Sequence, residues 1–237
     1  MQLKAVLFDL DGTLLPMDQD KFIECYLGLM AKKMALYGYD PQKLVGGIWK
    51  GTRAMVKNDG SRTNEEVFWQ AFQGSYGADA RKDEALFEEF YRNEFQQAKA
   101  ACGFAPAAAR VLALLKRQGI PAVLATNPLF PPVATQSRIR WAGLAPEDFI
   151  LVTTYDNSSF CKPNPDYYRA ILERIGVSPA ECLMVGNDVG EDMIAADLGM
   201  KVFLLTDCLI NKTGADISVY PNGSFPELLH YITALGE

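Results

Sequence analysis

Five short apolar segments, separated by stretches with helical spacing, constrain the fold of this 237-residue chain more than any other feature. They are residues 5–8, 122–125, 149–152, 183–185 and 202–205. Each segment is apolar throughout rather than alternating with polar residues, which is typical of strands covered on both faces. The alternation of such strands with helices predicts an α/β fold with a doubly wound parallel sheet.

Two of the intervening segments have the pattern of amphipathic helices. In residues 165–175, four apolar side chains recur at i, i+3, i+4 and i+7, so they share one helical face. Residues 106–118 carry valine and leucine side chains near one side in a similar way. We expect both segments to be helices that pack against the predicted sheet.

Residues 17–95 interrupt the alternation of strands and helices. They contain amphipathic stretches near residues 20–37, 64–73 and 83–99, with frequent aromatic residues and glycine-containing breaks. We interpret this region as an all-helical domain inserted after the first strand. The predicted organisation is therefore an α/β core of residues 1–16 and 96–237 and a helical domain of residues 17–95. Linkers near residues 14–18 and 94–104 would join them.

Polar side chains follow four of the predicted strands, at or shortly beyond the point where each strand ends. In an open parallel sheet, ligands bind beyond this edge. Asp9 and Asp11 come directly after the first strand, and a turn at Gly12 would let both carboxylates face the same side. The later strands are followed by further polar residues: Thr126 and Asn127, then Lys162, then Asn187, Asp188 and Asp192.

Together these residue types suit the transfer of a phosphoryl group. One carboxylate can attack phosphorus, while a second donates a proton and later removes one. A hard cation held by carboxylates offsets their repulsion from a phosphate, and a lysine and a hydroxyl can neutralise the transferring oxygens. The only histidine, His230, lies in an apparent terminal helix, which removes most histidine-based schemes.

Each motif taken alone also has an ordinary structural explanation. The first pair of aspartates could cap a turn, and Thr126 with Asn127 could form another turn. Lys162 could be solvated, and Asp188 could be one of the acids favoured at the start of a helix. Their occurrence at four strand ends favours one shared site over four coincidences.

The order and spacing of these residues resemble the motifs of the haloacid dehalogenase-like hydrolase superfamily, over residues 4 to about 206. Asp9-Leu10-Asp11-Gly12-Thr13 resembles the first motif, Thr126 the second and Lys162 the third. Gly186-Asn187-Asp188, followed by Asp192, resembles the fourth. The helical insert is similar to the cap of the C1-type subclass.

The resemblance implies a role for each of these residues. Asp9 would be the nucleophile and Asp11 the general acid and base. Mg²⁺ would be bound by the Asp9 carboxylate, the Asp11 backbone carbonyl and Asp188. Thr126, the Asn127 amide and Lys162 would bind the phosphate. Asp192 would not contact the phosphate and would act by pairing with Lys162.

The acid at position 11 bears on the type of reaction. Dehalogenases of the superfamily generally lack an acid two residues after the nucleophile, so Asp11 favours a phosphatase that hydrolyses a small phosphorylated metabolite. A phosphosugar mutase needs the same acid and remains an alternative. A protein of a different class, which binds a phosphate ligand for regulation and turns over poorly, is a further alternative.

The composition limits the partners that we expect. The net charge of −6 argues against general nucleic-acid binding, which requires a basic patch. The sequence contains no apolar run long enough for a membrane span, and the five cysteines form no CxxC pair. We therefore expect a soluble cytoplasmic protein with reduced thiols. The sequence does not predict its oligomeric state.

The helical insert is expected to close over the site and to select the substrate. Residues on its core-facing side would then contact the leaving group. If that group is anionic, the candidate contacts are the basic residues Lys21, Lys32, Lys33, Arg53 and Lys57. Each of them could equally lie on a solvated helix face.

Overall fold

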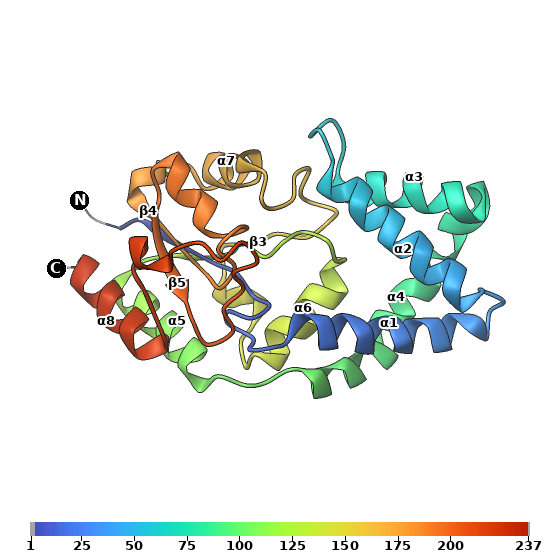
Figure 1. The fold of residues 1–237 in the computed structure, drawn as a ribbon, viewed down its shortest axis with the longest axis horizontal. Helices are drawn as coiled ribbons and strands as arrows, with labels where there is room; N and C mark the ends of the chain where they lie inside the picture. The colour runs from blue at the N-terminus through green and yellow to red at the C-terminus, as the bar shows by residue number, and fades with distance from the viewer. Residues whose placement is uncertain (1–2, 237) are drawn as a thin grey trace.

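The computed structural model describes residues 3–236 and confirms the predicted parallel sheet (Figure 1). Residues 1, 2 and 237, which the sequence assigns to the ends of the core, lie outside the described residues. All pairings in the sheet are parallel, and its strand order is β3-β2-β1-β4-β5-β6. The strands are β1 (Ala5–Phe8), β2 (Ala122–Leu124), β3 (Leu151–Val152), β4 (Cys182–Gly186), β5 (Lys201–Leu205) and β6 (Asn222–Gly223).

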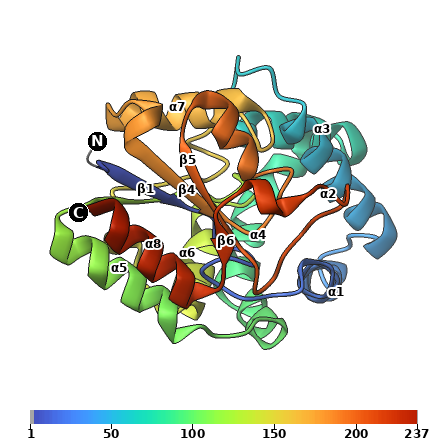
Figure 2. The same cartoon turned by 60° about the vertical axis from the view of Figure 1, so that its left-hand side comes forward.

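Helices cover both faces of the sheet (Figure 2). Because successive side chains of a strand point to opposite faces, Val6 and Phe8 belong to one buried cluster and Ala5 and Leu7 to another. The first cluster includes side chains of α5 (Pro106–Gln118), α6 (Pro132–Trp141) and α8 (Phe225–Gly236). The second includes α7 (Pro165–Ile175) and the short helix η5 (Met193–Leu198). Three single turns, η3 (Pro146–Asp148), η4 (Pro179–Glu181) and η6 (Ile217–Val219), complete the core.

All the regular elements between β1 and α5 are helices, as predicted. It contains α1 (Gln19–Ala35), α2 (Pro41–Val56), α3 (Asn64–Tyr76), η1 (Ala78–Asp83), α4 (Glu84–Arg92) and η2 (Glu94–Ala101). Side-chain caps fix the starts of the three long helices. Asp18 and Asp40 accept hydrogen bonds from backbone amides of the first turns of α1 and α2, and Thr63 and Glu66 form a capping box at α3.

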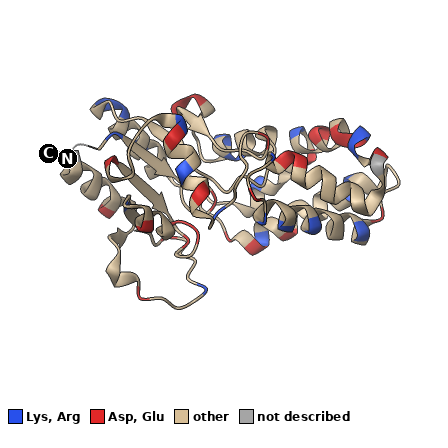
Figure 3. Ribbon diagram, turned by 90° about the horizontal axis from the view of Figure 1, so that it is seen from above, with Lys and Arg blue, Asp and Glu red and all other residues tan. Residues whose placement is uncertain are grey.

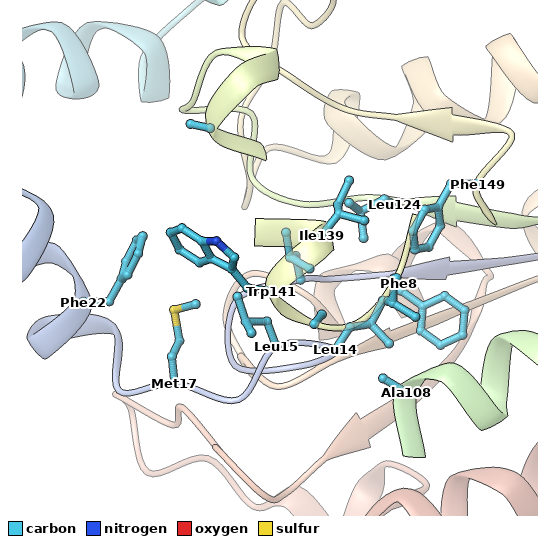
Figure 4. Close-up of a cluster of buried hydrophobic side chains, with 14 of the residues drawn as sticks. Phe8, Leu14, Leu15, Met17, Phe22, Ala108, Leu124, Ile139, Trp141 and Phe149 are labelled. Atoms are coloured by element: carbon cyan, nitrogen blue, oxygen red, sulfur yellow. The ribbon is translucent and has the colours of Figure 1, made fainter. Parts of the chain in front are cut away.

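One hydrophobic cluster runs from the sheet into this insert. Figure 4 shows Phe8 and Leu124 of the sheet beside Ile139 of α6, with Trp141 and Met17 leading to Phe22 of α1. This continuous cluster places the insert close to the sheet edge at which β1 ends.

The two chain segments that connect the insert to the core pair with each other. Met17 and Cys102 form an antiparallel bridge, and the Gly103 amide donates a 2.7 Å hydrogen bond to the Pro16 carbonyl. The sequence-based boundary at residue 95 falls inside η2, where Phe95 is buried against Phe22 of α1. Residues 94–101, expected to be part of a linker, instead form a helical segment packed on the insert.

Helices α2 and α6 and strand β6 are among the elements that were not predicted from the sequence. α2 contains Gly46, Gly47 and Gly51, which lower its helix propensity; a Cβ at Gly51 would lie 2.4 Å from the Phe68 ring, so this glycine allows α3 to approach. α6 buries polar side chains that obscure its amphipathic pattern. β6 has only two residues and depends on its pairing with β5. The predicted helix at 83–99 is also broken, at Asn93.

Charged residues are distributed over both parts of the molecule. Acidic and basic positions are interspersed along the helices of the insert (Figure 3). Within residues 3–236, no helix is both long and apolar enough to cross a membrane. All five cysteines are free thiols, and His230 is exposed on α8.

Candidate active site

A tight turn after β1 directs the side chains of the first motif to the sheet edge. The Asp9 amide donates a 2.9 Å hydrogen bond to the Val185 carbonyl of β4, which extends the pairing of the strands by one residue. Gly12 then adopts a φ of +92°, and a Cβ there would lie 2.4 Å from the Asn187 side chain. Only glycine meets both requirements without strain. The turn thereby joins the first and fourth motifs.

The Lys162 ammonium lies between two buried carboxylates. Its Nζ atom donates hydrogen bonds of 2.9 Å to Asp9 Oδ1 and 2.6 Å to Asp192 Oδ1. The side chains of Lys162 and Asp192 are each 1% exposed. Burial opposes the charge on Lys162, but Asp192 and Asp9 overcome this and raise its pKa above the ordinary value. The lysine is therefore charged and holds Asp9 in a fixed orientation.

Asp192 is packed tightly against the fourth motif. A Cβ on Gly186 would lie 2.1 Å from Asp192 Oδ2, so the glycine makes room for this carboxylate. The same oxygen accepts a 3.0 Å hydrogen bond from the Asp188 amide. Asp188 itself accepts hydrogen bonds through Oδ1 from the amides of Gly190 and Glu191, at 2.7 and 3.0 Å. These contacts fix the loop that follows β4.

The second motif connects the loops around it. The Asn127 side chain accepts a hydrogen bond from the Lys162 amide at 3.3 Å and donates one to Glu191 Oε2 at 3.0 Å. Thr126 is buried, and its carbonyl accepts hydrogen bonds from the hydroxyls of Thr153 and Tyr167. The Asn127 side chain is thus engaged in joining three strand-end loops.

Arg138 of α6 contacts Asp11 and was not identified from the sequence. Its Nη1 atom forms an ion pair with Asp11 Oδ2, and its side chain is fully buried. Arg138 also donates to the Ala134 carbonyl and the Thr135 hydroxyl, and its guanidinium lies 4.2 Å from the centre of the Phe130 ring. Burial raises the pKa of Asp11, whereas Arg138 acts to lower it. The sequence signal that could have pointed to Arg138 is a charged residue among the apolar positions of a helix.

Glu191 is a second residue that the sequence analysis missed. It lies beside Asn127, and burial raises the pKa of its carboxyl group; Lys162 opposes the rise, while Asp188 and Asp9 add to it. The sequence signal that could have pointed to Glu191 is its position between Asp188 and Asp192.

The helical insert contacts the loops that carry these residues. Asn64, at the start of α3, is buried, and its Nδ2 atom donates to the carbonyls of Pro128 and Phe160 at 3.3 and 3.4 Å. At the start of α1, Gln19 Nε2 donates to the Asp11 carbonyl at 3.3 Å. The insert therefore lies at the strand-end side of the core, next to the loops after β1, β2 and β3.

The charges of the site favour a divalent cation. Five carboxylates and only two cationic side chains belong to it: Asp9, Asp11, Asp188, Glu191 and Asp192, with Lys162 and Arg138. A phosphate would add further negative charge. The oxygen donors available are of the kind that Mg²⁺ prefers. No group of three His, Cys, Asp or Glu side chains among the described residues forms a ready metal site, but the predicted set needs only two carboxylates and one carbonyl. The residues thus fit a hard cation.

Comparison with known proteins agrees with this geometry. Residues 3–197 match the family model of the haloacid dehalogenase-like hydrolases. A phosphoglycolate phosphatase from Neisseria gonorrhoeae is 30% identical over 198 residues, which cover 81% of this chain and 75% of that protein. An N-acetylmuramic acid 6-phosphate phosphatase from Pseudomonas putida is 26% identical, and the match covers 92% of both chains.

A solved structure shows the same fold. The phosphatase from Thermococcus onnurineus superimposes with a TM-score of 0.60 at 22% identity, over 97% of this chain and 98% of that one. With a parallel sheet, four motifs at its strand ends and a family match over most of its length, the chain belongs to the haloacid dehalogenase-like hydrolases.

Proposed function

We propose that the protein is a Mg²⁺-dependent phosphatase that hydrolyses a small phosphorylated metabolite through an aspartyl-phosphate on Asp9. The observation that carries this proposal is the fixed Asp9 carboxylate at the end of β1, held by Lys162 at 2.9 Å. Asp11 follows two residues later with its own cationic partner, Arg138. A nucleophile and a proton donor are thus available in one site.

In the first step, an Asp9 carboxylate oxygen attacks phosphorus, and the bond between phosphorus and the ester oxygen breaks. Asp11 donates its proton to the departing alkoxide, which leaves as an alcohol. In the second step, the Asp11 carboxylate takes a proton from water as the water oxygen attacks phosphorus. The bond to Asp9 breaks, inorganic phosphate leaves, and both aspartates return to their initial states.

The other residues of the site have supporting roles in this mechanism. Thr126, the Asn127 amide and Lys162 bind the transferring phosphoryl oxygens. Asp192 orients Lys162 through their 2.6 Å contact. Arg138 orients the Asp11 carboxylate toward the leaving oxygen. Because Arg138 has further partners on α6 and on the Phe130 ring, its own position is well fixed.

Asp9, the Asp11 carbonyl and Asp188 would hold Mg²⁺. The ion would supply positive charge that lowers the repulsion between the Asp9 carboxylate and the phosphate, and would stabilise charge on the phosphoryl oxygens. The excess of carboxylates over cationic side chains in the site supports this assignment.

The helical insert acts as a cap in this proposal, with residues 17–95 as its predicted extent. The packing of η2 on α1 supports a cap that includes residues up to 101. The paired segments at residues 16–17 and 102–103 are the proposed hinge. Opening would admit substrate, and closure would exclude water from competing steps.

The substrates named for the relatives support a small phosphorylated metabolite as the substrate class. The decisive experiment is the release of inorganic phosphate from an aryl phosphate by the purified protein with Mg²⁺. Steady release that depends on Asp9 is expected. A protein that binds phosphate but releases none would be a regulatory binder, and one that transfers the phosphoryl group between sugar hydroxyls would be a mutase.

A further inference from the structure

An aromatic cavity of about 110 Å³ lies where the helical insert meets the core. All four α-helices of the insert contribute to its lining, including Tyr26 of α1, Trp69 of α3 and Phe87 of α4. The core contributes residues 129–131, which follow the second motif, and Tyr155, which follows β3. The cavity therefore spans the boundary between the two parts of the molecule.

Two side chains, Phe130 and Arg138, lie between the cavity and Asp11, the proton donor of the proposed reaction. Phe130 lines the cavity, and its ring packs on the Arg138 guanidinium, which in turn pairs with Asp11. Because Asp11 protonates the leaving oxygen in the proposed mechanism, the leaving alcohol must depart on the side where Asp11 lies. An alcohol portion that extends from Asp11 past Arg138 and Phe130 would reach this cavity.

The charges around the cavity disfavour an acidic alcohol. Among the residues that line it, none is Lys, Arg or His, and the charged members are Glu84 and Glu88. The basic residues proposed from the sequence do not line it: Lys33 is paired with Glu89 and Glu94, and the others are exposed at positions 21, 32, 53 and 57. A carboxylate in the cavity would lose its hydration without gaining a cationic partner.

The size and lining of the cavity favour one apolar group. A cavity of roughly 150 Å³ with an apolar lining takes up benzene, so about 110 Å³ suits a group no larger than one six-membered ring. The Trp69 ring lies at 84° to the Phe68 ring and at 83° to the Phe87 ring. Such an arrangement can contact a flat or branched apolar group from several sides.

We infer that the substrate is a phosphate monoester of an uncharged apolar or aromatic alcohol, about one ring in size, whose alcohol portion occupies this cavity. The inference rests on the proposed phosphatase function and specifies its substrate class. It distinguishes this chain from a phosphatase for small acidic esters such as phosphoglycolate.

Two matched pairs of esters test the inference on the wild-type protein. Butyl phosphate and 3-carboxypropyl phosphate have similar leaving groups and lengths but differ by one carboxylate. We expect kcat/KM to be at least about 30-fold higher for butyl phosphate. Benzyl phosphate should exceed ethyl phosphate by about 10- to 100-fold, from the apolar surface that it buries. Equal or better hydrolysis of the carboxylated or the smaller ester would overturn the inference.

Variants test whether the cavity itself makes this selection. Ile23 lines the cavity, so Ile23→Phe fills part of its volume. The change should lower kcat/KM for benzyl phosphate about 10-fold, while kcat/KM for acetyl phosphate stays within about 2-fold of the wild-type value. The control is Ile150→Phe, the same change at a solvent-exposed position of the α/β domain. If Ile23→Phe leaves benzyl phosphate unaffected, the cavity is only a packing void and the inference fails.

A charge reversal at the cavity rim gives an independent readout. Glu88→Lys should reduce the preference for butyl over 3-carboxypropyl phosphate at least about 5-fold. Glu24→Lys, an exposed α1 residue outside the lining, should leave it unchanged. An unchanged preference in Glu88→Lys would count against the cavity as the selecting element. Acetyl phosphate distinguishes a failure of this inference from a failure of the proposed function. If the wild type does not hydrolyse acetyl phosphate, the proposed function itself is wrong.

Discussion

The buried guanidinium of Arg138 pairs with the carboxylate of Asp11, two residues beyond the proposed nucleophile. The pair joins α6 to the loop after β1, so a helix of the core supports the first motif from the side. Asp11 Oδ1 is buried and makes no hydrogen bond among the described residues. Arg138 therefore holds one oxygen of this carboxylate, and the other is buried without a hydrogen-bond partner among the described residues.

Replacing Arg138 should affect proton transfer more than phosphoryl transfer. In Arg138→Gln, Asp11 loses the group that orients it, and turnover of an alkyl phosphate should fall by about 10- to 100-fold. Formation of the phosphoenzyme from an aryl phosphate should fall much less, because that leaving group needs little protonation. Burst and steady-state kinetics with both esters measure the difference.

Arg140→Gln, an exposed change on the same helix, is the matched control. Thermal unfolding of both variants would show whether Arg138→Gln only destabilises the fold. Equal losses for the two ester types in the first chemical step would contradict a positioning role for Arg138.

Lys162 should be required for stability as well as for activity. Lys162→Met leaves Asp9 and Asp192 buried without their cation, which should cost about 3–5 kcal/mol of unfolding free energy. The double variant Lys162→Met with Asp192→Asn removes one of the unpaired charges. It should recover a large part of the stability but none of the activity.

Chemical denaturation and phosphate release measure the two effects separately. Lys116→Met, an exposed change on α5, is the control for loss of a surface lysine. Wild-type activity in either Lys162 variant would show that the lysine does not bind the phosphoryl group.

Metal removal should abolish turnover reversibly. EDTA should eliminate phosphate release, and added Mg²⁺ should restore it, because the site otherwise holds an excess of carboxylates. Ca²⁺ should support activity poorly, since its looser and higher coordination alters how it engages the nucleophile. Asp188→Asn should raise the Mg²⁺ concentration needed for half-maximal activity more than Asp192→Asn does. Full activity of the metal-free protein, or the opposite order of the two variants, would refute the assignment.

Restricting the paired linkers should slow the turnover of large substrates. Met17 and Cys102 are bridge partners, so Met17→Cys allows a disulfide to Cys102 to form under oxidising conditions. The oxidised variant should lose about 10-fold or more in kcat for a large ester, because closure and product release require hinge motion. Acetyl phosphate should be affected much less, and reduction should restore the original rate. Oxidised wild-type protein is the control, and an oxidised variant with unaltered rates on both substrates would exclude a hinge at these residues.

The sequence predicted those features that depend on local pattern. Continuous apolar runs identified five of the strands. Polar residues at or beyond the ends of these strands pointed to Asp9, Lys162 and Asp192, which the structure brings together. Asp188 lies in the same loop as Asp192. Their proximity follows from the parallel sheet, which places the ends of its strands at one edge.

Features that depend on packing between distant segments were not predictable in the same way. Arg138 is 127 residues from Asp11 in the chain, and only the position of α6 brings them into contact. α2 was missed because its glycines weaken a helix locally, whereas Gly51 allows the close approach of Phe68. The helical segment at residues 94–101 gains its burial from α1, which its own sequence does not reveal.

The most direct test of the account is to trap the covalent intermediate on Asp9. An alkyl or aryl phosphate is mixed with the protein and Mg²⁺, the reaction is stopped in acid during turnover, and the peptides are analysed by mass spectrometry. We predict one added phosphoryl group on the peptide that contains Asp9, none in Asp9→Asn, and a loss of turnover of at least about 10³-fold in that variant. Undiminished turnover by Asp9→Asn, or a phosphoryl group found on a different residue, would contradict the central claim.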